Sequence, residues 1–78
     1  MKKLEGALFD FFEGREGEGA FQRLRAADLL QIGLIDSLDM VELAALISSV
    51  CEVRVDLSDS RHFDALRSID GMLAAFEP

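Results

Sequence analysis

The chain contains, at residues 33–43, the segment GLIDSLDMVEL, which continues to Cys51 as AALISSVC. Asp36 is a favourable N-cap residue, because its carboxylate can accept hydrogen bonds from the free N–H groups of a first helical turn. Apolar side chains then recur at the spacing of one helix face: Leu43, Ile47, Val50 and Cys51. The segment therefore predicts an amphipathic helix over residues 37–51, with Gly33 allowing a turn before it.

Apolar residues at helical spacing also occur near both ends of the chain. The N-terminal set predicts a helix over residues 3–13 with one buried face: Leu4, Leu8, Phe11 and Phe12. The C-terminal set predicts a last helix over residues 68–77, capped by Ser68, with these side chains turned inward: Ile69, Met72, Leu73 and Phe76. Gly71 lies inside this helix and is expected to cost it about 1 kcal/mol relative to alanine.

The segments between these helices complete the predicted fold. Residues 14–36 are expected to form a long loop with a helical turn within residues 21–27, and its apolar side chains are expected to pack over the helices. Residues 59–66 are expected to form a short helix. No alternation of apolar and polar residues is long enough to build a sheet. The 78 residues therefore predict one all-α domain, a small bundle of three main helices plus one short helix.

The charge of the chain is concentrated in its middle third. The formal net charge is −7, and residues 36–59 hold six acidic side chains against one basic side chain. An acidic surface repels nucleic acid and anionic membranes, so neither is expected as a partner, and basic protein surfaces are favoured. A solvated acidic face explains the same cluster equally well.

The number of cysteines indicates the cellular compartment in which the protein is expected. Cys51 is the one cysteine, so no internal disulfide can form and a reducing, cytoplasmic location is expected. A free cysteine is most often a small buried apolar residue, and that is the expected role of Cys51. Glu5 and Asp10 interrupt the N-terminal segment, which therefore does not read as a signal peptide, and no apolar run reaches the length of a membrane span.

Ser37 is the candidate site residue. A serine at a helix start is usually a cap, but Asp36 can perform that role and leave the Ser37 hydroxyl free. The first turn of a helix presents unpaired N–H groups and a partial positive charge, which suit a phosphate ester. On this local chemistry alone a purely structural serine remains the favoured interpretation.

The longer sequence around Ser37 resembles the acyl carrier protein family. The hallmark of that family is Asp-Ser-Leu at the start of the second helix, followed by Asp-x-Val-Glu-Leu. Seven positions match it: Asp36, Ser37, Leu38, Asp39, Val41, Glu42 and Leu43. Residues 68–70, Ser-Ile-Asp, are similar to the opening of the last helix of the family, so the resemblance extends to the end of the chain.

The resemblance implies a carrier rather than an enzyme, with an acyl-carrier-like helical bundle. A phosphopantetheinyl transferase would attach 4′-phosphopantetheine from coenzyme A to Ser37, and the thiol of this arm would hold an acyl or aminoacyl group as a thioester. The further partners implied are a loading ligase and acyltransferases with basic docking patches, and the carrier is expected to be a monomer without metal. Charged docking contacts are implied for Asp36, Asp39 and Glu42, and apolar ones for Leu38, Met40 and Val41.

Departures from the family pattern narrow the expected pathway. The end of the helix carries Ser48, Ser49 and Val50 where fatty-acid carriers have glutamates, and Cys51 replaces an aromatic residue. Fewer charges should weaken docking to general fatty-acid enzymes, so a specialised pathway of the fatty-acid or polyketide type is expected. Ile35 and Asp36 before the serine differ from the Gly-Gly-x-Ser pattern of peptide-synthesis carriers, which favours the acyl branch. A stand-alone aminoacyl carrier, such as a D-alanyl carrier, remains an alternative.

Two other classes of function compete with the carrier. A hydrolase with Ser37 as nucleophile lacks a Gly-x-Ser-x-Gly elbow, and His62, the single histidine, is expected to be a surface or capping residue. A structural zinc site is equally improbable with one histidine and one cysteine. A helical interaction module that is not modified, with Ser37 as a cap or a phosphorylation site, explains the periodicity and acidity but not the Asp-x-Val-Glu-Leu run.

Overall fold

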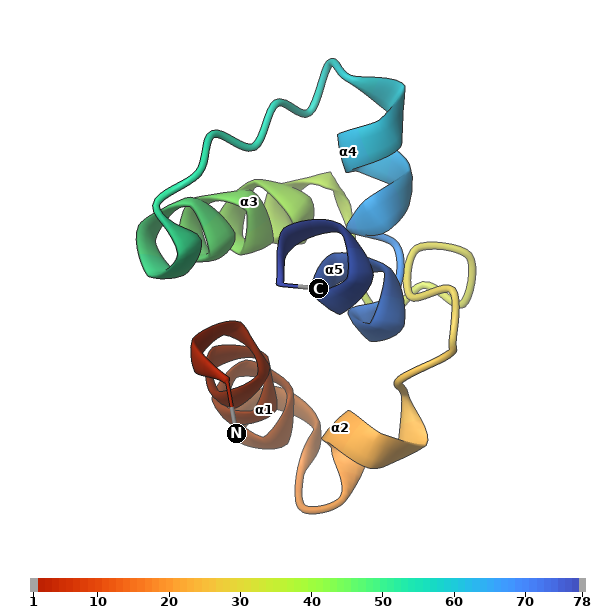
Figure 1. The fold of residues 1–78 in the computed structure, drawn as a ribbon. Helices are drawn as coiled ribbons and strands as arrows, with labels where there is room; N and C mark the ends of the chain where they lie inside the picture. Colours follow the sequence, from red (N-terminus) through yellow and green to blue (C-terminus); the bar gives the residue numbers. More distant parts are fainter. Residues whose placement is uncertain (1, 78) are drawn as a thin grey trace.

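Five helices follow one another in the computed structural model, which describes residues 2–77. They are α1 (Lys3–Glu16), α2 (Ala20–Arg23), α3 (Ser37–Cys51), α4 (Ser60–Ala65) and α5 (Ile69–Phe76). The first helix packs against α2, α3 and α5, and α4 packs against α5 (Figure 1). No strand occurs within the described range. The predicted all-α class is therefore confirmed, with α1, α3 and α5 as the main helices.

The core lies between the inner faces of these three helices. Their fully buried side chains are Leu4, Leu8, Phe12, Met40, Leu43, Ile47, Ile69 and Met72. The long connection before α3 adds buried side chains of its own: Phe21, Leu24, Leu29 and Ile35. The expectation that this connection packs over the helices is confirmed, because burial removes its apolar side chains from water.

The first helix ends at Glu16 and not at residue 13 as predicted. Gly14 stays helical, and the backbone changes direction at Gly17, whose φ of 95° lies in the region that favours glycine. The carboxylate of Glu13 then accepts hydrogen bonds of 2.7 Å from the N–H groups of both Gly19 and Phe21. These bonds cap α2 from a side chain of α1. The helix begins one residue before the turn that the sequence predicts within residues 21–27, and it ends at Arg23.

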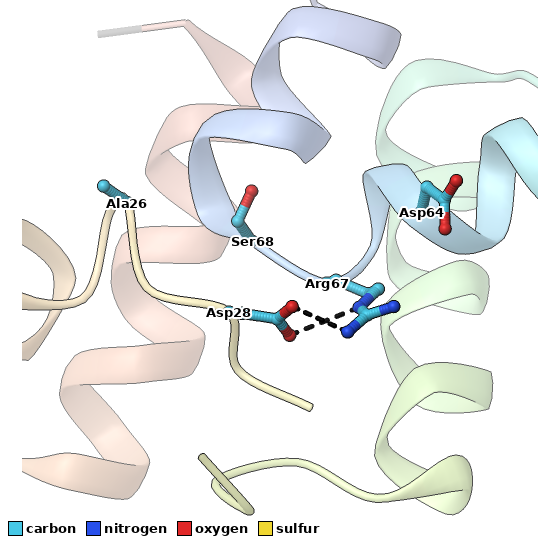
Figure 2. A pocket seen from close by; sticks show the side chains of 5 residues that line it. All are labelled: Ala26, Asp28, Asp64, Arg67 and Ser68. Carbon is cyan, nitrogen blue, oxygen red and sulfur yellow. Dashed lines mark hydrogen bonds and ion pairs between the residues drawn. The ribbon is translucent and has the colours of Figure 1, made fainter. Parts of the chain in front are cut away.

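The segment that leads into α3 is tied to the junction of α4 and α5. Arg67 donates through Nε and Nη2 to the two carboxylate oxygens of Asp28, at 3.2 and 2.7 Å, and Figure 2 shows this paired contact. The backbone N–H of Leu29 donates to the carbonyl of Arg67 at 2.7 Å. Gly33 then turns the chain with a φ of 77°, as the sequence predicts. The segment before α3 is thus fixed to this junction by both a side-chain pair and a backbone hydrogen bond.

The last helix begins as the sequence predicts, but its glycine has a different role. Ser68 accepts a hydrogen bond of 2.9 Å from the N–H of Gly71 and caps α5. A Cβ at position 71 would lie 2.7 Å from the carbonyl oxygen of Ala65 and 2.8 Å from the Ser68 hydroxyl. The expected penalty of Gly71 relative to alanine is therefore wrong, because the close approach of α4 and α5 leaves no space for a methyl group.

None of the helices within residues 2–77 combines the length and the apolar character that crossing a membrane requires.

Candidate functional site

Ser37 is the first residue of α3, and a reciprocal pair of hydrogen bonds defines the helix start around it. The carboxylate of Asp36 accepts from the N–H of Asp39 at 2.9 Å, and the carboxylate of Asp39 accepts from the N–H of Asp36 at 3.0 Å. This is a capping box, in which each side chain satisfies a backbone donor of the other residue. The predicted cap role of Asp36 is confirmed, and the Ser37 hydroxyl is not needed for it.

The Ser37 side chain is exposed, and its hydroxyl forms no hydrogen bond within the part of the chain that the structure describes. The N–H groups of Ser37 and Leu38 belong to the first turn and have no intrahelical acceptor. A free hydroxyl therefore stands beside two free backbone donors at the positive end of a 15-residue helix. This arrangement can accept a phosphate ester on the oxygen and hydrogen-bond its anionic oxygens.

The side chains that follow Ser37 divide between solvent and core. Leu38 is 76% exposed and Val41 is 55% exposed, and Glu42 is exposed beside them. Met40, in contrast, is 2% exposed and lies in the core, so its expected docking contact is wrong. The helical spacing indicates this burial, because Met40 precedes three other buried side chains of α3 by three, four and seven residues. These side chains are Leu43, Ala44 and Ile47.

Asp39 is also less available for docking than its position in the motif indicates. Arg15, near the end of α1, donates from Nη1 to Asp39 Oδ1 at 2.7 Å. Because Asp39 Oδ2 accepts from the backbone of Asp36, both of its oxygens are occupied. The guanidinium of Arg15, followed by the N–H of Asp36, lowers the pKa of Asp39 below its ordinary value. The sequence gives no signal for this pair, since the two residues are separated by 24 positions.

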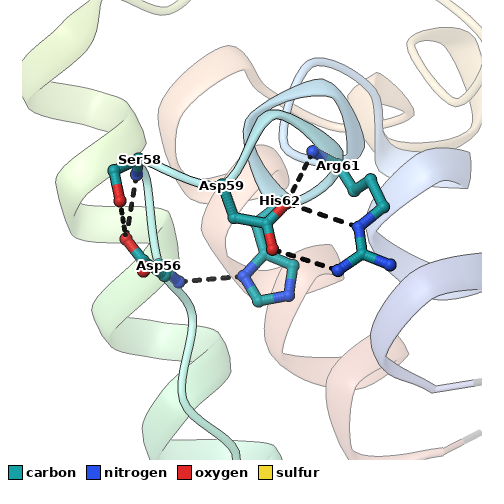
Figure 3. Close-up of polar contacts among 5 residues, drawn as sticks. All are labelled: Asp56, Ser58, Asp59, Arg61 and His62. Carbon is teal, nitrogen blue, oxygen red and sulfur yellow. Dashed lines mark hydrogen bonds and ion pairs between the residues drawn. The ribbon is translucent and has the colours of Figure 1, made fainter.

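His62 accepts a hydrogen bond from the turn before α4 and is not arranged as the base of a catalytic serine. Its Nδ1 accepts from the N–H of Asp56 at 2.9 Å, and its ring packs edge-on against Phe76 with 5.4 Å between centroids. The hydroxyl of Ser58 donates to the Asp56 carboxylate at 2.6 Å rather than to the histidine (Figure 3). Within residues 2–77 no hydrogen bond joins the imidazole to a serine hydroxyl, which a Ser–His nucleophile requires.

Cys51 closes α3 in a half-buried position against the core. Burial, assisted by the negative charge of Glu77, raises the pKa of its thiol. A raised pKa disfavours the reactive thiolate, so the chemistry of the site agrees with the structural role expected for Cys51.

Two hollows of the surface lie away from the start of α3. The larger, of about 330 Å³, is lined by Ala26, Asp28, Asp64, Arg67 and Ser68. Figure 2 shows that the guanidinium of Arg67 is turned to Asp28. The second, of about 210 Å³, is lined by Lys2, Glu5, Leu73 and Glu77. Ser37 belongs to neither lining. Across the described residues, no group of three or more histidine, cysteine and acidic side chains is arranged to hold a metal ion.

No model of a known protein family matches the chain, and neither does any curated protein or solved structure. Similarity therefore assigns no family. Function is therefore inferred from the residues of the Ser37 turn and from their geometry.

Proposed function

We propose that the chain is a carrier protein, not an enzyme, whose Ser37 carries a 4′-phosphopantetheine arm attached by a phosphopantetheinyl transferase. One observation carries the proposal: Asp36 and Asp39 cap α3 between themselves, so the Ser37 hydroxyl is exposed and unbonded at the first helical position. A serine that served only as a cap would be bonded to the backbone instead. When attached, the arm supplies a thiol that holds an acyl group as a thioester.

The turn around Ser37 fits a phosphate ester by its donors and its charge. The N–H groups of Ser37 and Leu38 are free to bond phosphate oxygens, and the helix dipole favours negative charge at this end. The carboxylates of Asp36 and Asp39 are turned into the capping box, and the guanidinium of Arg15 offsets the charge of Asp39. An added anion therefore meets donors at the first turn rather than two free carboxylates.

The outward side chains of α3 supply a contact surface next to the hydroxyl. Leu38 and Val41 offer exposed apolar area, and Glu42 offers a carboxylate for a basic residue of the transferase or of a loading enzyme. We place the protein in the cytoplasm as part of the proposal, because its one cysteine fits a reducing compartment. The serines near the end of α3, in place of acidic side chains, favour a specialised pathway, and Ile35 and Asp36 before the serine favour an acyl cargo.

The test is transferase-dependent modification, and the chain offers a matched control serine. Ser60 is also exposed and is also the first residue of a helix, α4, behind an aspartate cap, Asp59. Incubation with coenzyme A and a broad-specificity phosphopantetheinyl transferase should add one arm to the wild type and to Ser60→Ala, but none to Ser37→Ala. Intact-protein mass spectrometry measures the addition.

Two outcomes would overturn the proposal. One is a wild-type mass that stays unchanged while the same transferase modifies a known carrier. The other is a Ser37→Ala variant that still gains the arm.

A further inference from the structure

Arg15 covers the acidic side of α3 next to the Ser37 turn. Its Nη1 lies 2.7 Å from Asp39 Oδ1, and its guanidinium carbon lies 5.4 Å from the centre of the Phe11 ring, one helical turn earlier in α1. The side chain of Asp39 is only 19% exposed in this arrangement. A cation on a partner enzyme would therefore have to compete with Arg15 for the Asp39 carboxylate.

The pair leaves a surface with little free negative charge. The exposed side chains of α3 are Ser37, Leu38, Val41, Glu42, Ala45 and Ser49, and Glu42 is the one acidic residue among them. The charge of Arg15 also interacts with that of Glu42, so a single guanidinium offsets part of both carboxylates. The helix face beside the hydroxyl is therefore largely apolar, with Glu42 and the exposed cap residue Asp36 as its acidic side chains.

We propose that Arg15 determines which partner enzymes dock beside Ser37, by holding Asp39 in an intramolecular ion pair. The surface that remains fits a partner with an apolar groove for Leu38 and Val41 and one cation opposite Glu42. A partner whose basic patch depends on the Asp39 carboxylate is disfavoured, because it must compete with Arg15 for that carboxylate. This inference rests on the proposed carrier function and names the partner of the same site.

The test removes Arg15 and follows the modification of Ser37. In Arg15→Gln the carboxylate of Asp39 becomes available, so kcat/KM for modification by a transferase with a basic docking patch should rise about two- to fivefold at low salt, as for one exposed ion pair. Raised salt should abolish the gain. Arg23→Gln is the matched control: it removes the same charge from an exposed arginine that forms no ion pair among residues 2–77.

A double-mutant cycle separates direct pairing from net charge. Asp39→Asn alone should lower kcat/KM at low salt, because it leaves the Arg15 cation unpaired beside the docking face, and Arg15→Gln/Asp39→Asn should lose the gain of Arg15→Gln. Circular dichroism checks that each variant is folded, which is expected because the pair is exposed in part.

Each result decides the proposal. An unchanged or lowered kcat/KM for Arg15→Gln would overturn it, as would an equal gain in Arg23→Gln, which would show that net charge alone acts. If the wild type is modified and Arg15→Gln behaves like it, only the role of Arg15 is lost. If the wild type is never modified, the carrier function falls and this inference falls with it.

Discussion

Replacing Gly71 by alanine should destabilise the protein, although the residue lies inside a helix. Helix propensity alone favours alanine by about 1 kcal/mol. The added Cβ would lie 2.7 Å from the carbonyl oxygen of Ala65 and 2.8 Å from the Ser68 hydroxyl, closer than such atoms pack. One of these oxygens belongs to the backbone at the end of α4, and the other caps α5 at 2.9 Å from the N–H of Gly71.

The magnitude follows from these two contacts. Forcing a methyl group into a filled site costs about 1–3 kcal/mol. Displacing the Ser68 hydroxyl costs up to about 1 kcal/mol more, because the cap hydrogen bond is lengthened. The loss at the cap and the gain in propensity roughly cancel, so Gly71→Ala should lower the free energy of unfolding by about 1–3 kcal/mol.

Gly14→Ala is the matched control for this measurement. Gly14 also lies in a helix, α1, but a Cβ there would meet nothing within 4 Å. This variant should raise the free energy of unfolding by about 0.5–1 kcal/mol. Urea titrations followed by far-ultraviolet circular dichroism compare the two variants with the wild type, and thermal midpoints should shift by about 4–8 °C per kcal/mol. A Gly71→Ala variant as stable as the wild type would refute the reasoning.

Three further predictions concern the ends of α1 and the exposed side of α3. Glu77 accepts from the N–H groups of Leu4 and Glu5 at 2.8 and 3.1 Å, so Glu77→Ala should cost about 1 kcal/mol of stability in urea unfolding. The N–H groups of Phe21 and Gly19 lower the pKa of Glu13 below its ordinary value of 4.5. The ionised carboxylate therefore adds its full share to the stability above pH 4.5, and this share is lost as the pH falls through the lowered pKa. Glu13→Gln should accordingly make the stability depend less steeply on pH in the acid range. Glu42→Lys should slow transferase modification at low salt, and the difference from the wild type should shrink as salt rises.

Local signals in the sequence were sufficient to predict the helix that carries the site. The cap residue Asp36, the acidic first turn and the apolar spacing act within a few residues of one another, and α3 runs over residues 37–51 as predicted. The end of α1 was less predictable, because a helix tolerates one glycine and breaks only where φ must be positive, at Gly17.

Contacts between distant segments lay beyond the sequence patterns. Arg15 pairs with Asp39, and Ala65 approaches Gly71 closely, because of how the helices pack against one another. The spacing of residues within one helix does not encode this packing. Met40 shows the opposite case, since its helical spacing to buried residues indicated burial while its place in the motif indicated docking, and the core position prevails.

The central claim is that the Ser37 oxygen carries the phosphopantetheine arm. The most direct measurement is fragmentation mass spectrometry of the wild-type protein after exposure to the transferase and coenzyme A. The account predicts the added mass on the peptide that contains Ser37, with the peptide that contains the control Ser60 unmodified. An arm located on any other residue, or none at all while a known carrier is modified alongside, would contradict it.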